Sequence, residues 1–146
     1  MANANSPQTG LMATFNGADS TIVVDGNVMV GYAASGDIVQ VTWDNDRVSV
    51  DTDVMGTSVA SQNNKTSATM TLNLNQMSPS NKVLIDLYNR GVNGQNFAVD
   101  VRNSAEHVYG THCYIAKMPE VNSGEKAGTR AWQIHLLNAE IESILD

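Results

Sequence analysis

Cysteine is almost absent from this chain of 146 residues, in which Cys113 is the only one. One thiol cannot form an intrachain disulfide, so the fold has to be stabilised by its core. A core is feasible at this length, because such a domain buries roughly 68–70% of its unfolded surface. We expect one domain in which Cys113 is a small buried hydrophobic residue.

Basic residues are also scarce. Eight Lys and Arg residues stand against fifteen Asp and Glu residues, which gives a net charge of -7. This balance excludes a basic groove that grips nucleic acid by releasing counterions. Arg47 is the only base in residues 1–64, so one surface should be far more acidic than another.

Long apolar runs are missing as well. The first ten residues, MANANSPQTG, show neither the basic nor the apolar region of a secretory signal, and no run approaches the ~18 apolar residues of a membrane span. We therefore expect a protein that is made in a cytoplasm and does not insert into membranes. Residues 1–10 read as a flexible N-terminal arm and residues 11–146 as a single domain.

What the sequence has instead is alternation of apolar and polar residues. Two β-branched runs flank Asp25-Gly26, a dipeptide typical of a tight hairpin turn. Residues 66–75 place Met70, Leu72 and Leu74 on one strand face and Thr and Asn on the other. Further strands are expected in 97–103, 111–118 and 130–144, separated by loops at Ser104–Gly110 and Pro119–Gly128; the end of the last segment also fits a helical period.

One helix interrupts this pattern. Ser78 is the expected N-cap, and the helix should run from Pro79 to Arg90 and end before Gly91. Its apolar stripe is formed by Val83, Leu84, Leu87 and Tyr88. The helix should therefore pack against the sheet.

A second hairpin is expected where residues 37–43 and 47–54 alternate across Asp44-Asn45-Asp46, with residues 56–62 extending its return strand. The aspartates here surround a single base; the residues are Asp44, Asp46, Arg47, Asp51 and Asp53. The segment begins like a calcium loop, but its fifth position is Val48 and no suitable glycine or glutamate follows. An exposed ribbon also offers no burial to separate carboxyl pKa values for acid/base work. The simplest interpretation is a solvated acidic face.

No constellation of residues suggests catalysis. The three histidines lack metal-ligand spacing, and His112 and Cys113 should point to opposite faces of a strand. Nucleophile elbows, phosphate-binding glycine loops and dinucleotide fingerprints are absent from the sequence. We therefore expect neither an enzyme nor a cofactor.

Several short motifs in one order resemble the tail tube proteins of contractile-tailed bacteriophages. The matches span Ala13 to about Gly91, with weaker support from Lys126-Ala127-Gly128 and Trp132. They are Phe15-Asn16-Gly17 before the VVDG hairpin, Gly36-Asp37 at a strand start, Asp46-Arg47-Val48, and Thr71-Leu72 with Gln76 leading into Ser78-Pro79-Ser80-Asn81.

This resemblance implies a mainly β fold, an antiparallel β-sandwich or open barrel with one flanking helix and a long β-hairpin. It implies a structural virion protein, in which six copies form a ring and stacked rings form the inner tube of a contractile tail, the conduit for DNA ejection. Barrels of 16–18 strands already enclose an aqueous channel, so a larger one can pass a duplex. The implied partners are further copies, the tail sheath, baseplate and terminator proteins, and DNA that passes without specific binding.

The acidic hairpin then has two possible roles. Aspartates on a channel wall would repel DNA within a Debye length of ~8–10 Å and so prevent it from sticking. Alternatively, the hairpin reaches the neighbouring ring, where Arg47 pairs with an acid of the next copy. Two other functions stay open: the tube of a phage-like bacteriocin or secretion needle, and a carbohydrate- or surface-binding β-sandwich with exposed aromatics.

Overall fold

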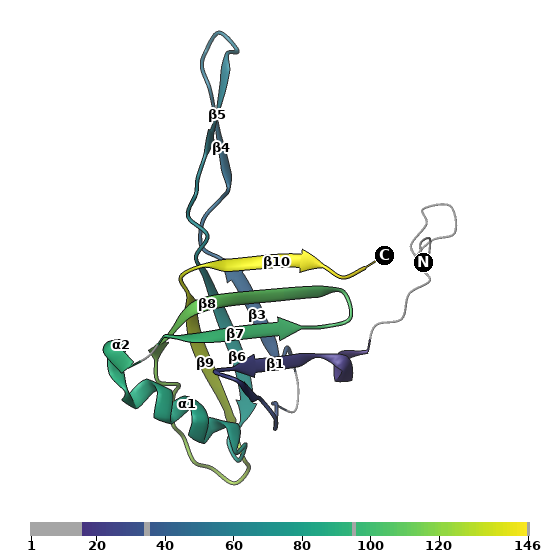
Figure 1. Ribbon diagram of the computed structural model, residues 1–146, viewed down its shortest axis with the longest axis vertical. Helices are drawn as coiled ribbons and strands as arrows, with labels where there is room; N and C mark the ends of the chain where they lie inside the picture. The colour runs from purple at the N-terminus through teal and green to yellow at the C-terminus, as the bar shows by residue number, and fades with distance from the viewer. Residues whose placement is uncertain (1–15, 34–35, 95, 146) are drawn as a thin grey trace, which may run out of the picture.

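The computed structural model describes residues 16–33, 36–94 and 96–145. The arm expected at residues 1–10 lies outside them. The elements, shown in Figure 1, are η1 (Gly17–Asp19), β1 (Thr21–Val24), β2 (Asn27–Val28), β3 (Val39–Trp43), β4 (Val48–Thr52), β5 (Ser58–Gln62), β6 (Ala68–Asn75), α1 (Ser80–Asn89), α2 (Gly91–Gly94), β7 (Phe97–Arg102), β8 (Glu106–Lys117), β9 (Thr129–Leu136) and β10 (Ala139–Ser143).

The body is an antiparallel sheet folded over on itself. Its strands follow the order β2-β1-β7-β8-β9-β6-β3, and β10 also pairs with β8. The first half of β8 pairs with β10 and its second half with β9, so the long strand belongs to both layers. Gly110 lies where β8 passes from one layer to the other, and a Cβ there would lie 2.8 Å from the Asn138 carbonyl oxygen. The antiparallel sandwich that the resemblance implies is thus confirmed.

The core lies between the two layers. In β6, Ala68, Met70, Leu72 and Leu74 are fully buried and alternate with half-buried polar residues, as predicted. Strand β9 repeats this pattern next to β6, with Trp132 only 1% exposed. Period-two alternation in adjacent strands therefore builds one apolar face.

Helix α1 closes one end of the core, as expected. Leu84 and Leu87 are buried, and Asn81 accepts a 3.0 Å hydrogen bond from Nε1 of Trp132. The predicted helix ends are correct to within one residue. Ser78, however, precedes the N-cap position, which Pro79 occupies; the Ser78 hydroxyl accepts a bond from the Ser80 amide and donates one to the Val30 carbonyl.

The first predicted hairpin is confirmed, whereas the second was paired incorrectly. Asp25 and Gly26 turn the first hairpin with φ angles of 51° and 77°. In the second case β3 pairs with β6, and β4 pairs with β5 to form a separate two-stranded hairpin. The physical reason is that β3 carries apolar residues that extend the core, whereas β4 meets a turn at Gly56, where φ is 88°.

The C-terminal part holds another correction. The loop expected at Ser104–Gly110 is only a short turn, because β8 already begins at Glu106. Asn103 closes this turn, since its side-chain oxygen accepts hydrogen bonds from the amides of Ala105 and Glu106 at 2.8 and 2.7 Å. The segment that also fitted a helical period forms the strand β10. Within the described residues, no helix is both long and apolar enough to span a membrane.

Candidate assembly surfaces

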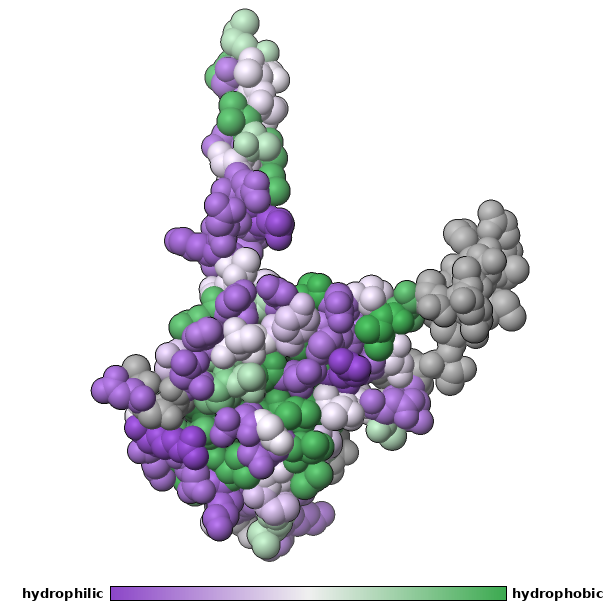
Figure 2. All heavy atoms as spheres, viewed as in Figure 1, coloured by the Kyte–Doolittle hydropathy of each residue, from purple (hydrophilic) through white to green (hydrophobic). Residues whose placement is uncertain are grey.

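The β4–β5 hairpin stands away from the body as an isolated two-stranded ribbon (Figure 1). All ten residues of its two strands are exposed, and Val48, Val50 and Val59 are each more than half exposed. Figure 2 shows hydrophobic residues along this ribbon, above a hydrophilic base. Two strands alone are marginally stable in water, so the pairing of β4 with β5 adds little stability by itself.

The predicted acidic residues occupy different parts of the hairpin. Asp44 lies at its base, where its amide donates to the Ser67 carbonyl and its Oδ1 accepts a 3.0 Å bond from Thr69. Asp51 and Asp53 lie further out, around the end of β4. The structure therefore separates Asp44 and Asp46 from the tip, which the sequence had assigned to them.

Arg47 also sits at the base. Its carbonyl accepts a 2.7 Å bond from the Asn63 amide and so closes the ribbon next to Val48. Among the ion pairs of the described residues, none joins Arg47 to the four aspartates. The acidic ribbon is thus not neutralised within one subunit.

Asp53 shapes the tip. Its Oδ1 accepts hydrogen bonds from the amides of Met55 and Thr57, both at 2.9 Å. The turn carries Val54 and Met55 fully or almost fully exposed, at 102% and 87%. Neither residue was among the predicted site residues, although an apolar pair beside Gly56 between polar strands was an available signal. Asp53 therefore holds an apolar tip in place.

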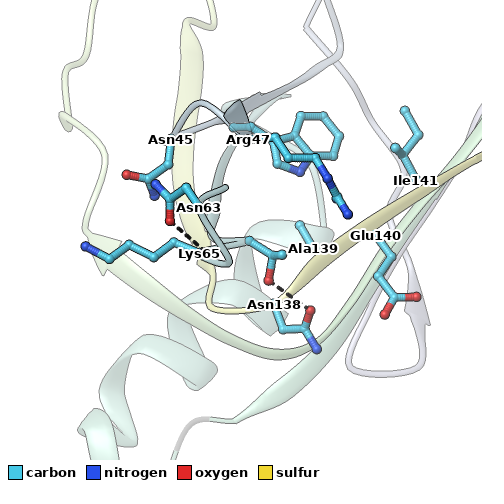
Figure 3. A pocket seen from close by; sticks show the side chains of 10 residues that line it. Asn45, Arg47, Asn63, Lys65, Asn138, Ala139, Glu140 and Ile141 are labelled. Carbon is cyan, nitrogen blue, oxygen red and sulfur yellow. Dashed lines mark hydrogen bonds between the residues drawn. The ribbon is translucent and has the colours of Figure 1, made fainter. Parts of the chain in front are cut away.

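A hollow lies at the base of the hairpin, between the free edges of β3 and β10. Its cavity of about 660 Å³ combines apolar side chains, Trp43 and Ile141, with two cations, Arg47 and Lys65 (Figure 3). Trp43 is 36% exposed there. A smaller cavity of about 160 Å³ continues along the core side of β3. The sandwich is therefore open along this seam.

The outer face of β3, β6 and β9 is polar but carries no carboxylate, ammonium or guanidinium group on these described strands. Its side chains are Gln40, Thr42, Thr69, Thr71, Asn73, Asn75, Thr129, Ala131, Gln133 and His135. The one titratable group of this set, His135, contacts Thr69 at 3.3 Å. We call this set the uncharged face.

The described residues were expected to hold neither a metal site nor a Cys–His pair. No group of three His, Cys, Asp or Glu residues there is arranged to hold a metal ion. His112 is exposed and Cys113 is buried, so they point to opposite faces as predicted. Burial raises the pKa of the Cys113 thiol to about 12, which disfavours the reactive thiolate.

Solved structures share this fold. A chain of the PVC sheath–tube complex, an extracellular contractile injection system in the extended state, matches with a TM-score of 0.62 at 9% identity, over 97% of this chain and 100% of that one. A chain of the anti-feeding prophage cap, described as a tube-terminating cap, gives 0.61 at 6% identity, over 90% and 92%. A chain of the PVC sheath/tube terminator gives 0.61 at 8% identity, over 89% and 97%.

Sequence comparison identifies the family. A comparison with curated proteins finds no match. Residues 12–146, however, match the family described as the Bacteriophage PhiTE tail tube protein, which confirms the resemblance drawn from the short motifs. The chain therefore belongs to the Bacteriophage PhiTE tail tube protein family and is a structural subunit of a phage tail tube, a component of the virion.

Proposed function

We propose that this subunit forms six-membered rings that stack head to tail into a tube through the β4–β5 hairpin. The observation that carries the proposal is the hairpin itself, an exposed ribbon with apolar side chains that no other described segment of the chain covers. A second copy would cover it. Such a covering contact adds stability in proportion to the apolar area removed from water, at about 25 cal/mol per Å².

The two ends of the subunit support stacking in one direction. The hairpin tip exposes Val54 and Met55, while the opposite end in Figure 1 carries the end of β6 and the β8–β9 loop. Met77 and Val121 are 80% and 73% exposed in that region. Gln76 and Asn122 join the two segments by a 3.1 Å hydrogen bond. Contacts between unlike ends leave a free surface at each end and therefore propagate.

The hairpin acids are assigned to these contacts between rings rather than to the channel wall. Asp51 and Asp53 lie on the outer part of the ribbon, and Arg47 at its base lacks an acidic partner among the described residues. An acid of a neighbouring copy would complete an ion pair with Arg47. Asp44 and Asp46 would then lie next to the same contact between copies.

The uncharged face is the proposed channel wall. A duplex passing through a channel is retained by each lysine or arginine that contacts a phosphate. Threonine, asparagine and glutamine side chains keep the wall hydrated without supplying cations. DNA would therefore pass without specific binding, and the subunit would act as a conduit and not as a catalyst.

The proposed partners follow from this arrangement. The fold is shared with chains from a sheath–tube complex and from tube-terminating assemblies. A sheath outside the tube, a terminator at one end and a baseplate at the other would complete a contractile tail. A second candidate, the tube of an extracellular contractile injection system, is favoured by the same fold matches. Neighbouring genes for a capsid and a terminase would distinguish the phage tail from it.

Negative-stain microscopy of the purified chain tests the proposal. At high concentration we expect rings or stacked tubes with a central hole. A matched variant, Val54→Ser with Met55→Ser, should retain rings and lose stacks, because it removes only the apolar tip. A wild-type chain that stays monomeric at every concentration contradicts the assembly, and undiminished stacking of the variant contradicts the role of the tip.

A further inference from the structure

The imidazole of His107 lies where strand β8 pairs with the neighbouring strands β7 and β10. His107 on β8 lies between Asp100 on β7 and Glu142 on β10. Its Nδ1 is 3.0 Å from Glu142 Oε1, and its Nε2 is 2.8 Å from Asp100 Oδ1. The His107 side chain is only 12% exposed. This cluster is separate from the hairpin and from the uncharged face.

The two contacts together favour a charged imidazole. A neutral ring carries a proton on one nitrogen and a lone pair on the other, whereas the imidazolium ion donates from both. Here each nitrogen faces a carboxylate oxygen, so a lone pair on either side would meet a negative charge. The Nδ1 contact is a hydrogen bond, while Nε2 is buried without an aligned acceptor and forms an ion pair with Asp100.

Strand β10 depends on its attachment to β8. It pairs with β8 from Ala139 opposite Gly110 to Ser143 opposite Glu106, and with no other strand of the described chain. Its other edge borders the cavity at the base of the hairpin, which Ala139, Glu140 and Ile141 line (Figure 3). The contacts of His107 with Glu142 on β10 and with Asp100 on β7 therefore link the strand at this free edge to two neighbouring strands.

We propose that His107 is a pH-sensitive clamp that holds β10 against the sheet when its imidazole is protonated. The charged and titratable groups around it are Asp100 and Arg102 on β7, Glu106 and Tyr109 on β8, and Glu140 and Glu142 on β10. The Tyr109 ring lies against the imidazole, with ring centroids 4.8 Å apart and the two ring planes tilted by 33°. Loss of the His107 proton leaves Arg102 as the one cation among four carboxylates, and these then repel one another across the two strand pairs.

The direction of the pH effect follows from the surroundings. The hydrogen bond to Glu142 raises the pKa of His107 above its ordinary value of 6.5, with Asp100 adding to the rise and desolvation and Arg102 opposing it. A group with a raised pKa in the closed state stabilises that state fully below its ordinary pKa. The stabilisation is lost as the pH rises through the raised pKa. The clamp therefore closes below the ordinary pKa of the imidazole and opens as the pH rises through the raised pKa.

Opening of β10 would widen the cavity beside Trp43 and loosen the base of the hairpin. The clamp thus couples the pH to the region from which the hairpin emerges. This coupling does not depend on six-membered rings or on the direction of stacking. It is a property of the single subunit.

The test is nuclear magnetic resonance on the full-length chain under dilute conditions where it is dispersed. Titration of the histidine signals should give His107 a pKa above its ordinary value of 6.5. Hydrogen-exchange protection of the β10 amides, divided by that of β9 amides, should fall as the pH rises. By linkage the fall can reach about tenfold for each pKa unit that separates the closed and open states.

Two variants decide between the clamp and a passive surface cluster. Glu142→Gln changes a 59% exposed side chain, so it should fold, and it should lower the His107 pKa and flatten the β10 profile. His135→Gln on the uncharged face should leave both unchanged. A His107 pKa that Glu142→Gln does not lower, or a β10 to β9 ratio that is independent of pH in the wild type, overturns the proposal.

Discussion

Strands β6 and β4 carry the same two-residue alternation, but they differ in what covers their apolar faces. In β6 the apolar residues are 0% exposed, because β3, β9 and the opposite layer surround them. In β4, Val48 and Val50 are 53% and 60% exposed, and β5 is the strand's one pairing partner in the described chain. Alternation therefore identifies an apolar face without saying whether the same chain or another copy buries it.

The largest effect is expected in the body. Leu84→Ala should lower the free energy of unfolding by about 2–5 kcal/mol, through lost burial and a residual cavity. Ile85→Ala, at a 39% exposed position of the same helix, is the matched control and should cost far less. Denaturant unfolding of the subunit measures both. Equal losses for the two variants would mean that α1 packs differently.

Two glycines with similar backbone angles sharpen the comparison. Gly31 has a φ of 72° and an added Cβ would lie 2.8 Å from the Ser78 Cβ, whereas Gly56 has a φ of 88° and open space around it. In both alanine variants the left-handed backbone conformation should lower the free energy of unfolding by roughly 1–2 kcal/mol. Gly31→Ala should add about 1–3 kcal/mol of overpacking. Thermal unfolding should therefore show a clearly larger drop for Gly31→Ala, and a larger drop for Gly56→Ala would contradict the fold.

The hairpin should show the opposite behaviour. Val50→Ser is expected to change subunit stability by no more than about 0.5 kcal/mol, because the side chain is already exposed. It should nevertheless weaken tube formation, since the lost apolar contact is made between copies. Thr52→Ser, on the same ribbon face, is the control, because it changes an exposed hairpin residue without removing an aliphatic side chain and should leave tube formation unchanged. Sedimentation of assembled against free protein decides the matter, and a destabilised monomer with normal assembly would reverse our assignment.

Lysine substitutions distinguish a channel-wall role from a hairpin role, and they should change the stability of the subunit least of all. Gln133→Lys on the uncharged face should give each ring a belt of phosphate contacts and retain DNA, with a salt slope that steepens by about 0.9 for each contact. Asp51→Lys on the hairpin should alter assembly and leave DNA passage intact in tails that form normally. DNA release from intact particles is the readout. Retention by Asp51→Lys alone would move the channel wall to the hairpin.

Much of the fold could be predicted because the signals were local. Asp25-Gly26 fixes its own turn, and the apolar stripe around Leu84 and Leu87 fixes the face of α1. Strand pairing could not be predicted in the same way. Apolar and polar residues alternate in both β3 and β4, and this alternation does not indicate which strand pairs with which. The turn at Asn103 was equally hidden, because the polar residues of β8 lie on its outer side and resemble a loop.

The sequence located the acidic residues near a hairpin, whereas their role at a channel wall or between rings stays a prediction. The aspartates do lie on and around a hairpin, as their spacing indicated. That Asp53 binds the amides of Met55 and Thr57, or that Asp44 binds Thr69, depends on a turn and a strand pair that the sequence did not specify. The uncharged face required the alignment of β3, β6 and β9 before its lack of charge became visible.

The half-exposed indole at the base of the hairpin makes this subunit its own optical sensor. The chain has two tryptophans, and Trp132 is buried and bonded to Asn81 while Trp43 borders solvent. Emission from an indole moves to shorter wavelength when water is removed from it. A Trp132→Phe chain would therefore report the closing of the seam through Trp43 alone, in real time and without an attached dye.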